Sequence, residues 1–578
     1  MLTDLSKLQE DASFDVLVVG AGGAGLGAAL FAALAGAKVL IVEHTELVGG
    51  TTAISAGTTW IPGTQHAASS NPGDTLAQAA NYLNNAIGNH SPLALRQAFL
   101  EQGANTVRML EEQTDVQFRP YPKHPDYISD LPGSTLNGRA LEPLPFDGRR
   151  LGKLFAVLRP PIPEFTVLGG MMVDRTDINH LLGLGQSFAS FRYAVKILLR
   201  HGLDRLRYPR GTRLVMGNAL IGRLVFSLSK HPKVQLLLNT SVAAIGSNAQ
   251  GVNSVTLRQG GQLKPIVVKG GVVLASGGFN RHAQKRSAML PGTQPDWCPG
   301  APGHTGTAQD LALALGAQWG TDGASHAFWA PVSLRKRPDG NQAVFPHFVM
   351  DRAKPGMLTV NQAGQRFVNE STSYHLFARA MLAENAKSPS RNIPAYLIAD
   401  AKALKNYGMG MVRPGGAGLK PFLADGYLTQ ADSLAELAQK LNVNAGNLVQ
   451  TVLRFNTLAE KGVDEDFHRG ETAYQHNIGD ATAGTPNPNL GPLLAAPFYA
   501  VRLYPGDIGA ATGLVTDTHA RVLNAQDQPI AGLYAVGNDM QSVMGGVYTA
   551  PGITIGPGLV FASLAAADAV SRADHRSS

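Results

Sequence analysis

The sequence predicts an α/β fold in which a parallel sheet with flanking helices is interrupted by an inserted α+β domain. A short apolar run at 16–19 leads straight into a glycine-rich turn and an Ala/Leu-rich helix at 26–35. A second apolar run at 38–42 ends in an acid, Glu43, and a strand-like run returns far along the chain at 532–538. This order is typical of a Rossmann-like dinucleotide-binding domain whose two parts are discontinuous in the sequence.

The turn after the first strand carries the pattern G-x-G-x-x-G at Gly20, Gly22 and Gly25. In this pattern the first glycine allows a tight turn, the second lets the backbone approach a pyrophosphate, and the third lets the helix pack on the strand. The helix N-terminus supplies free N–H groups for phosphate, and Glu43 would accept hydrogen bonds from ribose hydroxyls. The alternative is a glycine turn that binds nothing, but strand, helix, spacing and acid together favour a dinucleotide.

A loop of small residues follows between 49 and 60. Gly50, Thr51, Ser55 and Gly57 suit a segment that passes close to a flat ligand, although an ordinary surface loop is the alternative. In flavoproteins of this layout a Gly-Gly-x segment commonly follows the ribose acid, which favours FAD over NAD. The loop contains no histidine, so we expect the FAD to be held without a covalent link.

Two later strands also end at glycines, and an uncharged tail at 540–567 follows the second of them. Glycines and prolines interrupt this tail, so we expect a buried loop leading into a helix rather than a bilayer span. The tail would close the dinucleotide-binding domain again. From these segments we expect further cofactor contacts from Gly278, Gly537, Asn538, Thr554 and Ile555.

At 578 residues the chain is long enough for roughly two or three domains. We expect residues 14–285 to form the first part of the FAD-binding domain and residues 493–575 to return to it. Residues 286–492 are less regular and richer in proline, and we expect them to form the catalytic domain that holds the substrate.

Cysteine usage and the N-terminus predict a cytoplasmic location. Cys298 is the single cysteine, so no internal disulfide can form, which fits a reducing compartment. The first 14 residues are polar and acidic and lack the apolar core of a secretory signal. We expect neither a metal site nor a nucleic-acid partner.

The formal net charge of +7 is concentrated in a helical stretch at 179–230. One interpretation is a solvated basic face on a packing helix. The other is a membrane-surface helix that collects an apolar substrate. Apolar residues in this stretch lie among the basic residues Arg192, Lys196, Arg200, His201, Arg205, Arg207, Arg210 and Arg213.

Together these segments resemble the flavoprotein family of 3-ketosteroid dehydrogenases, which is related to the fumarate reductase and succinate dehydrogenase flavoproteins. The resemblance spans nearly the whole chain. Its most specific pieces are 125–127, 366–370 with Tyr374, and 544–557, and the last of these resembles the Δ1-dehydrogenase pattern in particular. Fumarate reductases use Arg and His to hold and protonate a dicarboxylate, whereas the corresponding loops here offer Tyr and apolar residues.

The resemblance implies an FAD-dependent 1,2-desaturation of a 3-ketosteroid, in which C2 loses a proton and C1 passes a hydride to flavin N5. It implies that the Tyr548 hydroxyl and the Gly552 N–H hold the C3 oxygen, that Tyr374 takes the C2 proton, and that Tyr127 hydrogen-bonds Tyr374. A free tyrosine has a pKa of about 10, so such a site must favour a phenolate.

The resemblance further implies a quinone-like or other electron acceptor. The basic stretch suggests a lipid-soluble substrate such as cholest-4-en-3-one, together with peripheral membrane contact. Three alternatives stay open: a 3-ketosteroid Δ4-dehydrogenase, a fumarate-reductase-like flavoprotein, and a non-catalytic carrier that uses the same nucleotide domain to bind a lipid or a protein.

Overall fold

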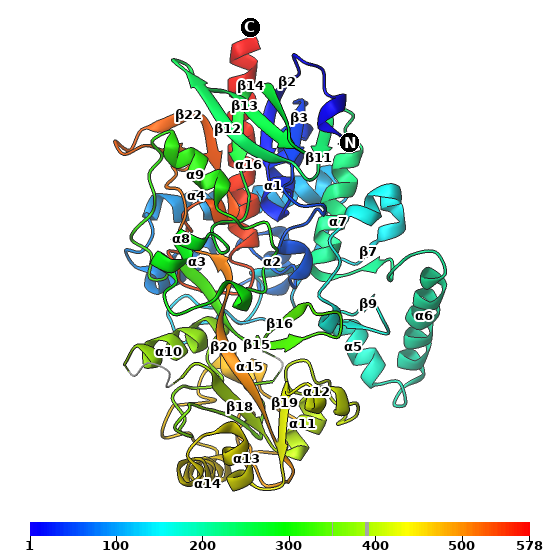
Figure 1. The fold of residues 1–578 in the computed structure, drawn as a ribbon, viewed down its shortest axis with the longest axis vertical. Coiled ribbons are helices and arrows are strands. Elements are labelled where there is room, and N and C mark those ends of the chain that lie inside the picture. Colours follow the sequence, from blue (N-terminus) through cyan, green and yellow to red (C-terminus); the bar gives the residue numbers. More distant parts are fainter. Residues whose placement is uncertain (350, 388–391, 578) are drawn as a thin grey trace.

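The computed structural model describes residues 1–349, 351–387 and 392–577. Figure 1 shows one large sheet in the upper half of the molecule and a second sheet in the lower half, with both chain ends in the upper half. The upper sheet has nine strands and the lower one six. The predicted α/β fold with a discontinuous nucleotide-binding part and an inserted α+β part is confirmed.

The upper sheet is built around β2 (Ser13–Val19), which lies between β3 (Val39–Val42) and β14 (Gln262–Leu274). All three strands run parallel. The apolar runs at 16–19 and 39–42 are buried on both faces, as expected of parallel strands covered by helices. β11 (Val234–Leu237) and β22 (Pro529–Ala535) also join in parallel. Its remaining strands are β1 (Leu2–Thr3), β12 (Ser241–Asn248), β13 (Gly251–Gln259) and β21 (Arg521–Leu523).

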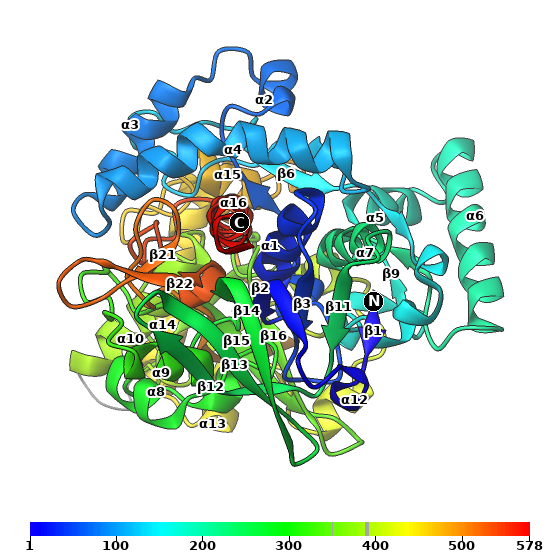
Figure 2. The same ribbon diagram turned by 90° about the horizontal axis from the view of Figure 1, so that it is seen from above.

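The uncharged tail forms α16 (Ile555–Ser577), which lies beside α1 (Gly23–Leu34) against the sheet (Figure 2). The two helices approach closely because Gly27 faces α16, where an added Cβ would come within 2.9 Å of Leu559. The predicted buried loop leading into a helix is therefore confirmed. Over the described ranges, no helix is both long and apolar enough to span a bilayer.

A helical region lies between β3 and β11 in the chain, and α7 packs on α1 while α4 packs on α16. It contains α2 (Gln65–Ser70), α3 (Leu76–Ile87), α4 (Leu93–Gln113), α5 (Arg175–Leu182), α6 (Phe188–Arg205), α7 (Met216–Ser229), β4 (Thr59–Trp60), β5 (Phe118–Pro120), β6 (Ala140–Pro143), β7 (Phe146–Asp147), β8 (Thr166–Val167), β9 (Met171–Met172) and β10 (Arg213–Leu214).

The lower sheet has β20 (Phe498–Ala510) as its longest strand, hydrogen-bonded to β15 (Ala327–Lys336) on one side and to β18 (Ala395–Ala399) on the other. The other strands are β16 (Gln342–Pro346), β17 (Met357–Val360) and β19 (Leu428–Ala431). The helices from 283 onward are α8 (Ala283–Met289), α9 (Thr307–Ala314), α10 (Tyr374–Lys387), α11 (Ala401–Tyr407), α12 (Lys420–Ala424), α13 (Leu434–Leu441), α14 (Ala445–Lys461) and α15 (Ala473–Ile478).

The pairing of β20 bears on the predicted boundary at 492/493. That boundary assigns β20 to the FAD-binding part, whereas its partners belong to the lower sheet. We therefore propose that the chain returns to the nucleotide-binding part after residue 510, where β21 and β22 join the upper sheet. The apolar pattern of a central strand does not reveal which sheet it will join, which explains the difference.

Buried ion pairs fix the loop that follows β5. Arg139 is 1% exposed and its guanidinium donates to Asp74 at 2.6 Å and to Asp126 at 2.7 Å. The Trp60 indole N–H also donates to Asp126, at 2.9 Å. Because Asp126 precedes Tyr127, these bonds hold the Tyr127 backbone in place.

We expect Arg139→Met to destabilise the protein by about 3–5 kcal/mol, because it leaves two buried carboxylates without a counter-charge. The control is Arg149→Met, which removes an exposed pair with Asp147 and should cost no more than about 1 kcal/mol. The unfolding temperatures of the two variants give the comparison. Equal losses in both variants would contradict a structural role for the buried pairs.

Candidate active site

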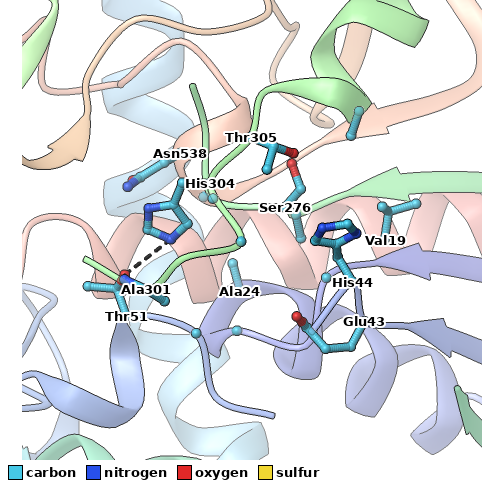
Figure 3. A pocket seen from close by; sticks show the side chains of 18 of the residues that line it. Val19, Ala24, Glu43, His44, Thr51, Ser276, Ala301, His304, Thr305 and Asn538 are labelled. Carbon is cyan, nitrogen blue, oxygen red and sulfur yellow. Dashed lines mark hydrogen bonds between the residues drawn. The ribbon is translucent and has the colours of Figure 1, made fainter. Parts of the chain in front are cut away.

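A cavity of about 460 Å³ opens at the carboxyl ends of the parallel strands of the upper sheet. Figure 3 shows that side chains from distant parts of the chain line this cavity, among them Glu43, Thr51, His304 and Asn538. The edge formed by strand ends is the usual ligand position in such folds, and the volume is typical of a small-molecule site. The predicted cofactor residues that line it are Gly20, Gly22, Glu43, Gly50, Thr51, Ser55, Gly537, Asn538, Thr554 and Ile555.

The glycine turn leaves open space for a ligand at its centre. A Cβ built on Gly22 meets no protein atom within 4 Å, and Gly22 borders the cavity. Gly20 has a φ of +106°, and an added Cβ there would lie 2.3 Å from the Ala275 oxygen. A Cβ on Gly25 would lie 2.0 Å from the Gly20 oxygen. The turn is thus tight where the chain packs and open where a ligand would lie.

Three of the predicted cofactor residues lie outside the cavity wall. Gly25 packs helix against turn. Gly57 has a φ of +69°, and a Cβ added there would lie 2.5 Å from the Gly217 backbone nitrogen. Gly278 donates its N–H to Asp539 at 2.9 Å. A sequence does not distinguish a glycine required by close packing from one that faces a ligand, and cofactor contacts of these three glycines stay predictions.

Glu43 lies at the end of β3 and fixes the glycine turn itself. Its carboxylate accepts from the Ala21 N–H at 2.9 Å and from the Thr45 N–H at 2.9 Å. Each carboxylate oxygen can accept more than one hydrogen bond. The acid therefore retains acceptor capacity for a ribose while it holds the turn.

Two polar residues of the cavity were missed by the sequence analysis. His304 contacts the Thr51 hydroxyl at 3.1 Å, while its Nδ1 is buried without a partner in the described structure. Burial, with Arg281 and Arg159 nearby, lowers the pKa of His304 to about 4, so the ring is neutral near pH 7. The Arg159 Nε is also buried and unpartnered. Buried polar atoms normally have partners, so both fit a polar cofactor. Glycines at 303 and 306 flank His304, and this glycine-rich loop was the sequence signal that could have indicated a ligand contact.

The predicted catalytic tyrosines converge from three distant parts of the chain. The Tyr127 hydroxyl donates to the Tyr374 hydroxyl at 3.0 Å. The Tyr548 ring stacks on Tyr127 with centroids 5.6 Å apart and meets Tyr374 edge-on at 5.1 Å. All three side chains are buried. Tyr374 begins α10, and Tyr548 lies in the loop before α16.

Backbone contacts hold these loops together. The Tyr127 N–H donates to the Thr549 oxygen at 2.8 Å, and the Trp60 N–H donates to the Gly552 oxygen at 3.2 Å. Gly552 has φ +90°, and a Cβ added there would lie 2.4 Å from the Thr58 oxygen. Only glycine fits at this crossing, so the tail passes directly over the loop at 58–60.

Burial dominates the electrostatics of the tyrosine cluster. It raises the pKa of Tyr127 and of Tyr374 well above the usual tyrosine value. Burial also raises the pKa of Tyr548 to about 12. Tyr548 therefore keeps its proton and suits a hydrogen-bond donor. A base in this cluster requires a further stabilising interaction, because desolvation disfavours a phenolate.

Comparison with known proteins first identifies the class of protein to which this chain belongs. Residues 15–555 match the family model described as FAD binding domain. The chain is therefore an FAD-dependent flavoprotein, and the cavity with its glycine turn and unpartnered polar groups fits that cofactor.

Individual relatives narrow this class. The chain is 37% identical to 4-oxocyclohex-2-ene-1-carboxylate 5-dehydrogenase of Sinomonas cyclohexanicum, over 99% of this chain and 96% of that protein. It is 35% identical to 3-oxosteroid 1-dehydrogenase of Mycolicibacterium smegmatis, over 97% of this chain and 98% of that one. The crystal structure of 3-ketosteroid Δ1-dehydrogenase from Sterolibacterium denitrificans, in complex with 1,4-androstadiene-3,17-dione, matches with a TM-score of 0.89 at 33% identity, covering 97% and 99%. The chain belongs to the family of FAD-dependent 3-ketosteroid Δ1-dehydrogenases.

Gly22 offers a test of the cavity that leaves the fold intact. We expect Gly22→Ala to weaken FAD binding at least tenfold, because its methyl group meets no protein atom and would enter the cofactor space. The control Gly202→Ala adds a methyl group that also meets nothing within 4 Å, but on α6. Flavin absorbance per protein and titration of the apoprotein with FAD measure the effect. Unchanged affinity in Gly22→Ala would place the cofactor elsewhere.

Proposed function

We propose that this enzyme introduces a C1=C2 double bond into a 3-ketosteroid. The hydrogen bond of 3.0 Å between the buried Tyr127 and Tyr374 hydroxyls carries the proposal. Proton abstraction next to a ketone needs a base whose negative charge is held by a fixed donor. Two buried tyrosines in hydrogen-bond contact, with a third beside them, supply that arrangement.

The family resemblance supplies the residue roles, and the chemistry of a carbon next to a ketone explains why such roles are needed. The Tyr548 O–H and the Gly552 N–H would hold the C3 oxygen, where negative charge develops as the C2 proton leaves. Tyr374 would take that proton, and the hydrogen bond from Tyr127 would stabilise its phenolate. FAD, when bound, accepts the hydride that leaves C1. The proton and the hydride together account for the two hydrogens removed from the substrate.

Two other substrates are compatible with the same ketone chemistry. A relative at comparable identity is named for a 4-oxocyclohexene carboxylate, a single ring with the carbonyl in an equivalent relation to the new double bond. A Δ4-dehydrogenase would remove hydrogens from the other side of the C3 ketone. Incubation with a saturated 3-ketosteroid, a Δ4-3-ketosteroid and 4-oxocyclohexanecarboxylate, followed by product analysis, separates the three. Formation of 1,4-diene from the Δ4-3-ketosteroid is the outcome that we expect.

We expect Tyr374→Phe to slow flavin reduction by about 100-fold or more, the usual contribution of a general base, while steroid binding is retained. Rapid mixing of oxidised enzyme with steroid in the absence of oxygen measures this step alone. The control Tyr504→Phe changes a tyrosine of β20 whose ring packs at a tilt against Trp297, with ring centroids 5.1 Å apart, and should leave the rate unchanged. A Tyr374→Phe enzyme with the original rate would mean that the base lies elsewhere.

We also propose that this enzyme is cytoplasmic and meets the membrane surface through α6, where an apolar steroid and a quinone-like acceptor would both be available. Figures 1 and 2 both show α6 at the edge of the molecule. Its inner side packs through Ala194 and Ile197. Phe188 is 80% exposed and Leu203 67% exposed. The exposed side carries the apolar residues Phe188, Phe191, Leu199, Leu203 and Leu206 and the basic residues Arg192, Lys196, Arg205 and Arg207.

The other basic residues of the stretch are engaged within the protein. Arg200 pairs with Asp147 at 2.9 Å and Arg213 with Asp177 at 2.6 Å. Arg210 is buried. The solvated-face interpretation explains the exposed charges but not the exposed phenylalanine and leucines among them. A basic and apolar face is the combination that binds anionic bilayers.

We expect replacement of Arg192, Lys196, Arg205 and Arg207 by serine to lower partition into anionic liposomes at least tenfold, because each cation near such a surface contributes about 1 kcal/mol. A matched variant in which Lys336, Lys402, Lys405 and Lys420 become serine loses the same charge from exposed positions elsewhere. Sedimentation with vesicles measures both variants. Equal partition of the two variants would contradict a specific role for α6.

A further inference from the structure

A fourth tyrosine adjoins the catalytic cluster without an assigned role. Tyr474 lies on α15, and its ring centroid is 4.8 Å from that of Tyr127. The side chain is 1% exposed, and its hydroxyl has no hydrogen-bond partner within the described part of the chain. An unpaired buried hydroxyl is costly, which suggests that this one has a task in some state of the enzyme.

Arg352 is the group that faces this tyrosine. It lies in the segment between β16 and β17 and is 0% exposed. Its guanidinium donates to three backbone oxygens, those of His347 at 3.2 Å, Phe348 at 3.0 Å and Glu370. Its Cζ lies 5.3 Å from the centre of the Phe377 ring.

Arg352 has no carboxylate partner at ion-pair distance among the described residues, whereas Arg139 and Arg469, the two other arginines that are at most 1% exposed, both have one. Arg139 pairs with two aspartates, and Arg469 pairs with Glu370 at 3.2 Å. A buried charge normally requires a counter-charge. Carbonyl dipoles orient the Arg352 cation but do not neutralise it, so a positive charge remains beside the tyrosine cluster.

The charged and titratable groups around this pair come from several elements. The Arg352 guanidinium interacts electrostatically with Tyr127, Tyr374, Tyr474 and Asp351. Asp351 is itself held by the His347 ring at 2.6 Å and by the Gly410 N–H at 2.8 Å.

The tyrosines themselves face a further set of groups. Tyr548 interacts electrostatically with both Tyr127 and Tyr474. Tyr121 and the His124 ring also face Tyr127. Burial raises the pKa of Tyr474 to about 12, and the Arg352 charge opposes this rise. Geometry also places Arg352 beside the cluster, because its guanidinium donates to the Phe348 oxygen at 3.0 Å and the Phe348 ring lies 4.8 Å from the Tyr374 ring.

We propose that Arg352, acting through Tyr474, is the counter-ion of the tyrosine cluster and stabilises the negative charge that the cluster carries when Tyr374 is ready to act as a base. The proposal rests on the proposed function. Before turnover the cluster gives one proton to water. During turnover the substrate C2–H bond breaks and its proton binds the Tyr374 oxygen, while the hydride leaves C1 for the flavin. The cluster then loses that proton to water and regains its charge. Arg352 does not touch the substrate and is a positioning residue.

The test is the pH dependence of anaerobic flavin reduction in the holoenzyme with androst-4-ene-3,17-dione. Removal of a nearby positive charge raises the pKa of a phenol, so less of the base form exists at a given pH. We expect Arg352→Met, which removes the charge, and Tyr474→Phe, which removes the hydroxyl through which that charge acts, to shift the acid limb of the rate profile upward by about one pH unit or more. Arg352→Lys keeps the charge and should shift it less than Arg352→Met does.

The control is Tyr427→Phe, which removes another buried tyrosine hydroxyl, one that contacts Ser333 at 2.7 Å and lies outside the cluster. It should leave the acid limb in place. If the Arg352 variants do not fold, Tyr474→Phe decides alone. An unchanged acid limb in Tyr474→Phe, or a rate lowered equally at every pH, would overturn the proposal. Failure of the proposed function is distinguishable, because it would appear as full activity in Tyr374→Phe.

Discussion

The hydrogen bond between Tyr127 and Tyr374 joins the two halves of this enzyme at the point where chemistry is proposed to occur. Tyr127 belongs to the loop after β5, fixed by the buried Arg139 and by the tail through the Thr549 oxygen. Tyr374 begins α10, which packs on β15 and β20 of the lower sheet. The distance of 3.0 Å between the hydroxyls is therefore a consequence of how both sheets are assembled. A change in either half moves the base relative to its donor.

Burial of the cluster makes a tyrosine phenolate costly, so other groups of the site must stabilise its negative charge. Aromatic walls suit an apolar substrate and exclude water, but the same desolvation disfavours the phenolate that a base requires. One hydrogen bond from Tyr127 only partly offsets that cost. A cation without its own carboxylate, such as Arg352, offers a compensating charge within the protein. The bound flavin and the substrate ketone contribute further polar groups during catalysis.

Much of the fold and site could be predicted because local patterns determine them. The turn at 20–25 follows from glycine spacing, and the resemblance identified Tyr127, Tyr374 and Tyr548 before any geometry was available. The sheet to which β20 belongs could not be predicted, because a buried strand looks alike in either sheet. Gly57 and Gly278 resembled ligand contacts because close backbone packing and ligand approach both require glycine. Arg352 and Tyr474 lie outside the motifs, and only folding brings them beside Tyr127.

The central claim is that this flavoprotein oxidises a 3-ketosteroid at C1 and C2. Anaerobic addition of androst-4-ene-3,17-dione to the purified yellow enzyme, with the flavin absorbance followed and the steroid recovered, tests it most directly. We expect stoichiometric bleaching of the flavin and recovery of the 1,4-diene. A colourless protein, a flavin that stays oxidised, or bleaching without a new C1=C2 bond would contradict it.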